Sequence, residues 1–278
     1  MTVLTFTLIM LAAAFLAGFI GSLTGLGGGV VLVPLLTIVF KVDIHYAIGT
    51  SLVAVIATSS GAAAAYVKEG ITNIRLGMFL EIATTLGALI GATIIVYMPT
   101  NIIAVLFGSV LIFSAIMTIR KKLDPLETDA KSEMAVRLKL NSNYPTPNGK
   151  VNYTVRHVPA GFIMMIGAGM LSSLLGIGSG AFKVLAMDNV MRVPFKVSTT
   201  TSNFMIGVTA AASSVLYFHR GYIDPVLTFP VVIGVFAGAM VGAKVLIGSG
   251  VRVLRIIFSI VITIVAIEMI YNGLRGKI

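Results

Sequence analysis

Hydrophobic positions form long uninterrupted runs along most of the chain. Residues 1–40 contain no charged side chain, and within 76–119 only Glu81 is charged. Apolar runs of about 18 residues or more are typical of helices that cross a bilayer, where every backbone polar group must be paired. The pattern therefore predicts an all-α, polytopic membrane protein.

Polar breaks divide the runs into five helical segments on each side of a polar stretch. We expect a first transmembrane repeat at 1–120, a polar cytoplasmic linker at 121–155 and a second transmembrane repeat at 156–278. The linker mixes both charge signs and is poor in apolar residues, so it is expected to be solvated. The segments are expected at 2–22, 26–40, 46–67, two within 76–119, 157–175, 181–191, 197–218, 225–247 and 253–273.

A constant offset of 151 residues relates the two halves. It brings the stretch Gly25-Leu26-Gly27-Gly28-Gly29 onto Gly176-Ile177-Gly178-Ser179-Gly180. The ungapped offset holds from about position 17 to position 119, which indicates an internal duplication. Further matches are Gly18 with Gly169, Thr50-Ser51 with Thr201-Ser202, Tyr66 with Tyr217, and Gly87 and Gly91 with Gly238 and Gly242. The last four glycines are assigned to close helix packing.

The number of crossings in each half decides how the repeats are oriented. Five crossings would invert the second half, whereas four crossings and a re-entrant loop would leave the halves parallel. With the linker in the cytoplasm, the inverted arrangement places four basic residues inside that the parallel arrangement would place outside. The parallel arrangement would bring three other basic residues inside. The positive-inside rule therefore favours inverted repeats, which are also the pattern of transporters with broken helices in matching positions.

Each glycine cluster is expected to break a helix within the membrane, because glycine gains the most backbone freedom when helical geometry is lost. The unwound stretch would present backbone N–H groups and the positive end of the next helix to a cavity, which together favour an anion. Close packing through Gly21, Gly25 and Gly29 is the alternative, but packing alone does not require so dense a cluster twice.

Polar side chains early in the third segment of each half are the next candidates. Thr50 and Ser51 match Thr201 and Ser202, and Asn203 follows directly. Their hydroxyl and amide groups could donate hydrogen bonds to an oxyanion near the loops. Helix capping, or a bond to a carbonyl one turn back, accounts for them equally well.

Charged residues inside the apolar segments are rare. Lys183 follows the second glycine cluster and could supply a positive charge to an anion, although extension to the membrane surface or pairing with Asp188 is favoured. Glu81 and Glu268 could couple transport to protons. Each is close in sequence to an arginine, so both are expected at the interface.

The remaining composition excludes several classes of function. The net charge of +10 reflects basic residues gathered around the linker, where anionic lipid is a better counter-charge than nucleic acid. The chain has no cysteine and three scattered histidines, so no metal site is indicated. Without paired catalytic acids or a nucleophile–base pair, the sequence predicts no enzyme and no cofactor.

Three features together are specific to one family: the run GFIGSLTGLGGGVVLVPLL, its degenerate copy in the second half and the polar linker between them. In these the chain resembles the TauE/SafE family of membrane anion transporters, which is associated with export of sulfite and movement of organosulfonates. The resemblance covers almost the whole chain. It implies that the loops at 24–29 and 175–180 flank the substrate site.

Residues and resemblance together predict a secondary transporter, multi-pass in the cytoplasmic membrane, that moves a small sulfur-containing oxyanion by alternating access. An anion channel that uses the same loops as a filter is the alternative. A coupling proton or other ion, and assembly into a homo-oligomer, are left open. The candidate substrate-binding residues are Thr24, Gly25, Gly27, Gly28, Gly29, Thr50, Ser51, Gly176, Gly178, Ser179, Gly180, Lys183, Thr201, Ser202 and Asn203.

Overall fold

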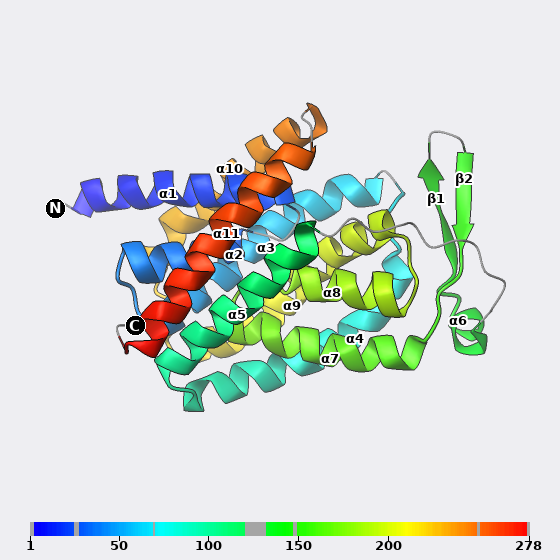
Figure 1. Cartoon of the computed structure of the whole chain (residues 1–278), viewed down its shortest axis with the longest axis horizontal. Helices are drawn as coiled ribbons and strands as arrows, with labels where there is room; N and C mark the ends of the chain where they lie inside the picture. Colours follow the sequence, from blue (N-terminus) through cyan, green and yellow to red (C-terminus); the bar gives the residue numbers. More distant parts are fainter. Residues whose placement is uncertain are drawn as a thin grey trace.

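Helices make up most of the backbone that the structure describes (Figure 1). The computed structural model describes residues 3–24, 28–68, 70–119, 132–146, 149–248 and 251–276. The first half contains α1 (Val3–Thr24), α2 (Gly29–Pro34), α3 (Ile44–Lys68), α4 (Ile74–Ile94) and α5 (Thr100–Ile119). The second half contains α7 (Val158–Leu175), α8 (Gly180–Leu185), α9 (Phe195–His219), α10 (Pro225–Gly248) and α11 (Val251–Leu274).

The offset that relates the two sequences also relates the bounds of the helices. Adding 151 to the bounds of α3 gives those of α9 at both ends, and α2 maps onto α8 in the same way. The starts of α4 and α5 map onto the starts of α10 and α11, and the end of α1 maps onto the end of α7. Each half therefore folds into the same succession of helices.

The most extensive helix contacts each pair a helix of one half with a helix of the other half. In Figure 1, α1 lies along α10, and the equivalent pair α7 and α4 lies on the opposite side of the bundle. Gly18 faces the Val235 carbonyl, and its counterpart Gly169 faces the Thr84 carbonyl. Small residues allow backbones to approach closely in this way. The packing role predicted for Gly87, Gly91 and Gly238 is confirmed, because each meets the backbone of the partner helix.

The equivalent helices α3 and α9 cross the centre of the bundle in opposite directions. At the start of α3, His45 stacks on Tyr222, which follows the end of α9, with ring centroids 5.1 Å apart. Near the start of α9, the Thr201 hydroxyl accepts a hydrogen bond from the backbone N–H of Asn73, 3.1 Å away, beyond the end of α3. These two contacts fix an antiparallel arrangement.

The short helices α2 and α8 each continue as one turn of π-helix. Those turns are Leu35–Val39 and Ala186–Val190, so each broken helix extends over 11 residues, Gly29–Val39 and Gly180–Val190. At 1.5 Å per residue this is about 16 Å, roughly half the thickness of a bilayer core. The segments predicted at 26–40 and 181–191 are therefore half-length helices.

The outer surface of the bundle carries large apolar side chains. Val215, Phe218 and Phe229 are 67%, 68% and 71% exposed, more than the surface of a soluble protein tolerates in such numbers. Within the described residues, three helices are long and apolar enough to cross a membrane, at Ile74–Tyr97, Val158–Leu175 and Pro225–Gly242. The protein is an all-α membrane protein, as the hydrophobic runs predict.

The polar stretch between the halves contains local structure that its composition did not predict. It forms a short helix, α6 (Glu133–Arg137), and an antiparallel hairpin of β1 (Ser142–Thr146) and β2 (Gly149–Tyr153), seen at one end of the bundle in Figure 1. Three of its apolar side chains, Ala135, Leu140 and Val155, are buried in one cluster with residues of α4 and α7, whereas Met134, Val136, Leu138 and Val151 are exposed.

Asn73, the N-cap of α4, attaches this hairpin to the bundle. Its side-chain amide donates to the Leu140 carbonyl and to the Tyr153 hydroxyl, both at 2.8 Å. Burial raises the pKa of Tyr153 to about 12. Most of the described residues between 132 and 155 are exposed, and these few contacts attach the stretch to the bundle.

Candidate functional site

The two glycine clusters meet at the centre of the bundle. A Cβ atom on Gly29 would lie 2.5 Å from the Gly176 carbonyl oxygen and 2.6 Å from the Ser51 hydroxyl, so only glycine fits there. The Ser51 hydroxyl donates to the same Gly176 carbonyl at 2.7 Å. Gly28 is also buried, whereas Gly25, Gly27 and the side chain of Thr24 lie outside the described residues.

The second cluster breaks the helix as the sequence predicts. Gly176 ends α7 with a φ of 66°, and Gly178 follows with a φ of 71°. Ser179 then takes a left-handed φ of 47°, which is uncommon for a residue with a side chain, before Gly180 begins α8. The loop therefore leaves regular helix geometry at the depth where the halves cross.

The matched hydroxyl residues divide into two pairs with different partners. Ser51 and Ser202 face the loops, because the Ser202 hydroxyl donates to the Gly180 carbonyl at 3.2 Å. Thr50 instead shares a 3.2 Å hydrogen bond with Thr228 on α10, and Thr201 accepts from the N-cap of α4. Of the two predicted pairs, the structure brings the serines to the loops and directs the threonines to helix contacts.

A hydrogen-bonded chain of charged groups lies beside the second loop. The Lys183 ammonium on α8 donates to the Thr209 hydroxyl on α9 at 2.5 Å. That hydroxyl is 2.6 Å from the Glu81 carboxylate on α4. Lys183 is fully buried and Glu81 is 8% exposed, so Lys183 does not extend outward to the membrane surface and neither side chain lies on the outside of the bundle.

The sequence position of Glu81 gave a misleading indication of its depth. Arg75, six residues earlier, is exposed at the start of α4, but Glu81 lies on the face of that helix that packs against α9. The offset could have indicated its importance, since Glu81 and Lys183 correspond to the apolar residues Val232 and Leu32 in the other half. Glu268, by contrast, is exposed on α11.

Six buried side-chain polar atoms have no partner among the described residues. Apart from the Thr72 hydroxyl, they lie on α4, on α9, on α7, which packs against α4, and in the loop before α8: the second carboxylate oxygen of Glu81, the Asn203 side-chain nitrogen and the Ser172, Ser173 and Ser179 hydroxyls. An unpaired buried polar group costs about 1–3 kcal/mol. Such a cluster beside a helix break is therefore suited to hold a polar ligand.

The packing of α4 on α7 brings these groups to one level of the bundle. Gly169 on α7 faces Thr84 on α4, and the antiparallel register continued by one turn brings Ser172 level with Glu81. Ser179 is tied to the same place because its carbonyl accepts from the Lys183 backbone N–H at 3.1 Å. The site thus draws on α4, α7, α8 and α9.

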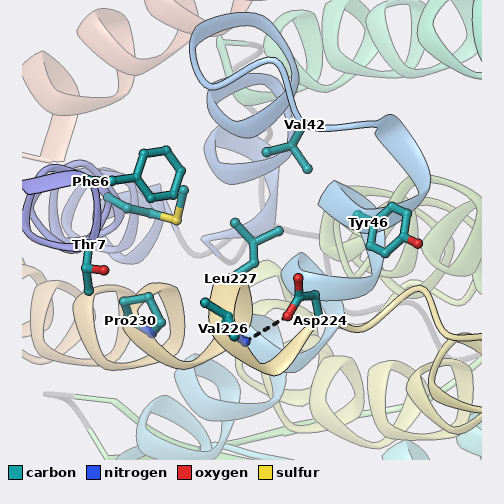
Figure 2. A pocket seen from close by; sticks show the side chains of 9 residues that line it. Phe6, Thr7, Val42, Tyr46, Asp224, Val226, Leu227 and Pro230 are labelled. Carbon is teal, nitrogen blue, oxygen red and sulfur yellow. Dashed lines mark hydrogen bonds between the residues drawn. The ribbon is translucent and has the colours of Figure 1, made fainter. Parts of the chain in front are cut away.

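Away from this cluster, a cavity of about 290 Å³ opens near the first turns of α1, α3 and α10 (Figure 2). Its walls are mainly apolar, and its carboxylate, from Asp224, accepts a 2.8 Å hydrogen bond from the Val226 N–H at the start of α10. No residue of the predicted site lines it. The lining residues are Phe6, Thr7, Met10, Val42, Tyr46, Asp224, Val226, Leu227 and Pro230.

The fold is that of a helical membrane protein in which two related halves cross beside a buried polar cluster. The chain belongs to the TauE/SafE family: the family model described as sulfite exporter TauE/SafE matches residues 10–269. The resemblance seen in the glycine-rich run is thereby confirmed.

Named relatives point the same way. The chain is 28% identical to the probable membrane transporter protein YunE of Bacillus subtilis, over 96% of this chain and 98% of the relative. It is 27% identical to the probable membrane transporter protein YdhB of the same organism, over 85% and 89% of the two chains. A probable membrane transporter protein of Methanocaldococcus jannaschii is 23% identical over 94% of each chain. No solved structure matches the chain. Family and relatives together indicate a membrane transporter.

Proposed function

We propose that the protein is a secondary transporter that carries a small sulfur-containing oxyanion, sulfite or an organosulfonate, across the cytoplasmic membrane. The observation that carries this proposal is the cluster of buried donors beside the second loop. Lys183 supplies a full positive charge, and Ser179 and Asn203 supply donors without a protein partner among the described residues. An oxyanion satisfies several such donors at once, because each of its oxygens accepts hydrogen bonds.

The choice of substrate class also draws on the family description, which names sulfite export. Sulfite and sulfonates share a compact group of three oxygens on sulfur. The Gly29–Gly176 crossing packs its backbones too tightly for side chains, so we place the substrate on the α8 side of that crossing rather than within it. Ser51 and Ser202 hold the loop carbonyls in place from α3 and α9.

We infer alternating access from the course of the equivalent helices. The antiparallel directions of α3 and α9 are what inverted repeats require, and inverted repeats commonly exchange conformations across a central site. The half-length helices α2 and α8 would move with their own halves. A carrier of this kind saturates with substrate and exchanges substrate for substrate.

The experiment is uptake of radiolabelled sulfite into proteoliposomes that contain the purified protein. We expect saturable uptake that is accelerated by unlabelled sulfite inside the vesicles. Lys183→Leu should abolish it, whereas Lys196→Leu, which removes an exposed lysine at the start of α9, should retain it. Linear, non-exchanging flux would identify a channel instead, and full activity of Lys183→Leu would refute the site.

A further inference from the structure

The Thr209 hydroxyl connects an acid and a base inside the membrane. It accepts from the Lys183 ammonium at 2.5 Å and is placed to donate its own proton to the Glu81 carboxylate at 2.6 Å. A hydroxyl can do both at once, since it has one proton and two lone pairs. The Thr84 hydroxyl lies 3.4 Å from that of Thr209, and the Thr85 hydroxyl donates to the same Glu81 oxygen at 3.4 Å. Lys183, Thr209 and Glu81 therefore form one continuous hydrogen-bonded unit.

The charges in this unit balance each other. Among the described residues, Lys183 is the charged side chain that interacts electrostatically with Glu81. Glu81 is likewise the charged side chain that interacts with Lys183. The helices packed against α4 add no competing charge here. Within Val158–Leu175, α7 has no titratable side chain, and the titratable residues of α9 (Lys196, Tyr217 and His219) lie near its two ends. Asp188 lies on the π-helix after α8.

A neutral pair is a poor receptor for an anion. While Glu81 is ionised, its negative charge cancels that of Lys183, and a second anion in the same low-dielectric space would be repelled by the carboxylate. Once Glu81 is protonated, no described side chain provides a counter-charge for Lys183. An anion that enters then restores neutrality, so proton and anion favour each other's binding.

The unpaired second oxygen of Glu81 provides a place for that proton. It is buried and has no hydrogen-bond partner among the described residues. The counterpart site in the other half, with Val232 and Leu32, offers neither an acid nor a base. One proton-binding position is thus built into the molecule beside one candidate anion position.

We propose that Glu81 is a proton-binding site that couples the uptake of one proton to the binding of each substrate anion at Lys183. The proposal rests on the proposed function and names its coupling ion. Glu81 takes its proton from hydronium of the aqueous phase: an O–H bond of hydronium breaks and leaves water, an O–H bond forms on the carboxylate, and no other covalent bond changes. Lys183 keeps its three ammonium protons and exchanges its counter-charge from Glu81 to the anion.

The test is isothermal titration calorimetry of the purified protein with methanesulfonate, which stays ionised at all working pH values, and with sulfite as the second probe. Titrations in buffers with different ionisation enthalpies, such as bis-Tris and imidazole, count the protons taken up. We expect about one proton per bound anion, and an affinity that weakens by about tenfold per pH unit above the pKa of the site.

Two variants separate Glu81 from other carboxylates. Glu81→Gln should bind methanesulfonate without proton uptake and with an affinity that does not depend on pH. Glu268→Gln removes an exposed carboxylate of α11 and should keep the wild-type proton uptake. If Glu81→Gln does not fold, a pH gradient across wild-type proteoliposomes serves instead, and an acidic exterior should drive methanesulfonate inward.

The outcomes distinguish failure of the proton coupling from failure of the proposed transport function. Anion binding without proton uptake, pH-dependent binding by Glu81→Gln, or uptake that ignores a pH gradient would overturn the coupling and leave the transporter proposal in place. Failure of both probes to bind the wild-type protein would overturn the proposed function, and the coupling with it.

Discussion

Two regions of the molecule are built alike and differ in chemistry. One lies where α4, α8 and α9 meet. The other lies where their counterparts, α10, α2 and α3, make the equivalent arrangement. Polar residues of the first region include Glu81, Lys183 and Asn203, with Ser172 on the adjoining α7, and at the equivalent positions of the second region stand Val232, Leu32, Leu52 and Gly21.

This difference separates the requirements of folding from those of function. Leu32 and Leu52 are fully buried, so the same helix arrangement is filled by apolar side chains in one half. Burying an ion pair in place of apolar residues brings little or no net stability. The charges of the first region are therefore not needed for packing, and the second region serves as an internal control for every substitution in the first.

The largest expected effect comes from removing only one charge of the Glu81–Lys183 pair. Glu81→Val copies Val232 and leaves the Lys183 ammonium buried without its counter-charge, which should lower the free energy of unfolding by about 3–5 kcal/mol. The double variant Glu81→Val/Lys183→Leu copies the whole apolar pair and should recover most of that loss. Thermal unfolding in detergent measures both. Equal melting temperatures for the single variant and the wild type would mean that the two charges are not coupled.

A methyl group at the loop crossing should have the next largest effect. Gly29→Ala puts a Cβ atom 2.5 Å from the Gly176 carbonyl oxygen, so the loops must separate, at about 1–3 kcal/mol and with loss of transport. Gly167→Ala is the matched control, because its Cβ would meet open space on α7 and should leave both properties unchanged or slightly improved. Thermal unfolding and sulfite uptake of the two variants test this prediction. Equal behaviour of the two variants would contradict the close contact between Gly29 and Gly176.

Asn203→Leu, which copies Leu52, should affect binding rather than stability. The loss of one hydrogen bond to a charged ligand amounts to about 1.5–3 kcal/mol, so the Kd for sulfite should rise by about tenfold or more. The melting temperature should stay the same or increase. Thr50→Val, whose hydroxyl is bonded to Thr228, should leave the Kd unchanged. Calorimetry of both variants would contradict the assignment if the order of the two effects were reversed.

The smallest effect is expected outside the bundle, where no equivalent region exists. Tyr153→Phe removes the acceptor of the Asn73 amide and should cost about 1 kcal/mol. The folded pKa of Tyr153, about 12, is above its ordinary value of 10.0, so the unfolded chain loses this proton first as pH rises. The stabilisation is full below pH 10 and should be lost between pH 10 and 12. Alkaline melting curves of Tyr153→Phe should lack this step, and an identical step in both proteins would contradict it.

The sequence predicted those features that depend on local pattern. The apolar runs gave the membrane class, and the glycine clusters gave the helix breaks at Gly176 and Gly178, because both signals are contained in neighbouring residues. The constant offset also predicted that the halves would share one succession of helices.

Features that depend on helix faces could not be predicted in the same way. The depth of Glu81 depends on the rotation of α4 between α7 and α9, and nothing near Glu81 in the sequence determines that rotation. Thr50 and Ser51 are adjacent in sequence, yet one faces α10 and the other faces the loop, as their distinct partners show. The stretch around the hairpin is attached to the bundle by three buried side chains, Ala135, Leu140 and Val155, which an average composition conceals.

The central claim is that the charged region carries the substrate while its apolar counterpart only supports the fold. The most direct measurement is sulfite uptake into proteoliposomes by the double variant Glu81→Val/Lys183→Leu, with its melting temperature recorded alongside. We predict a folded protein that melts close to the wild type and shows no saturable uptake above empty vesicles. Uptake at the wild-type rate by this folded variant would contradict the account.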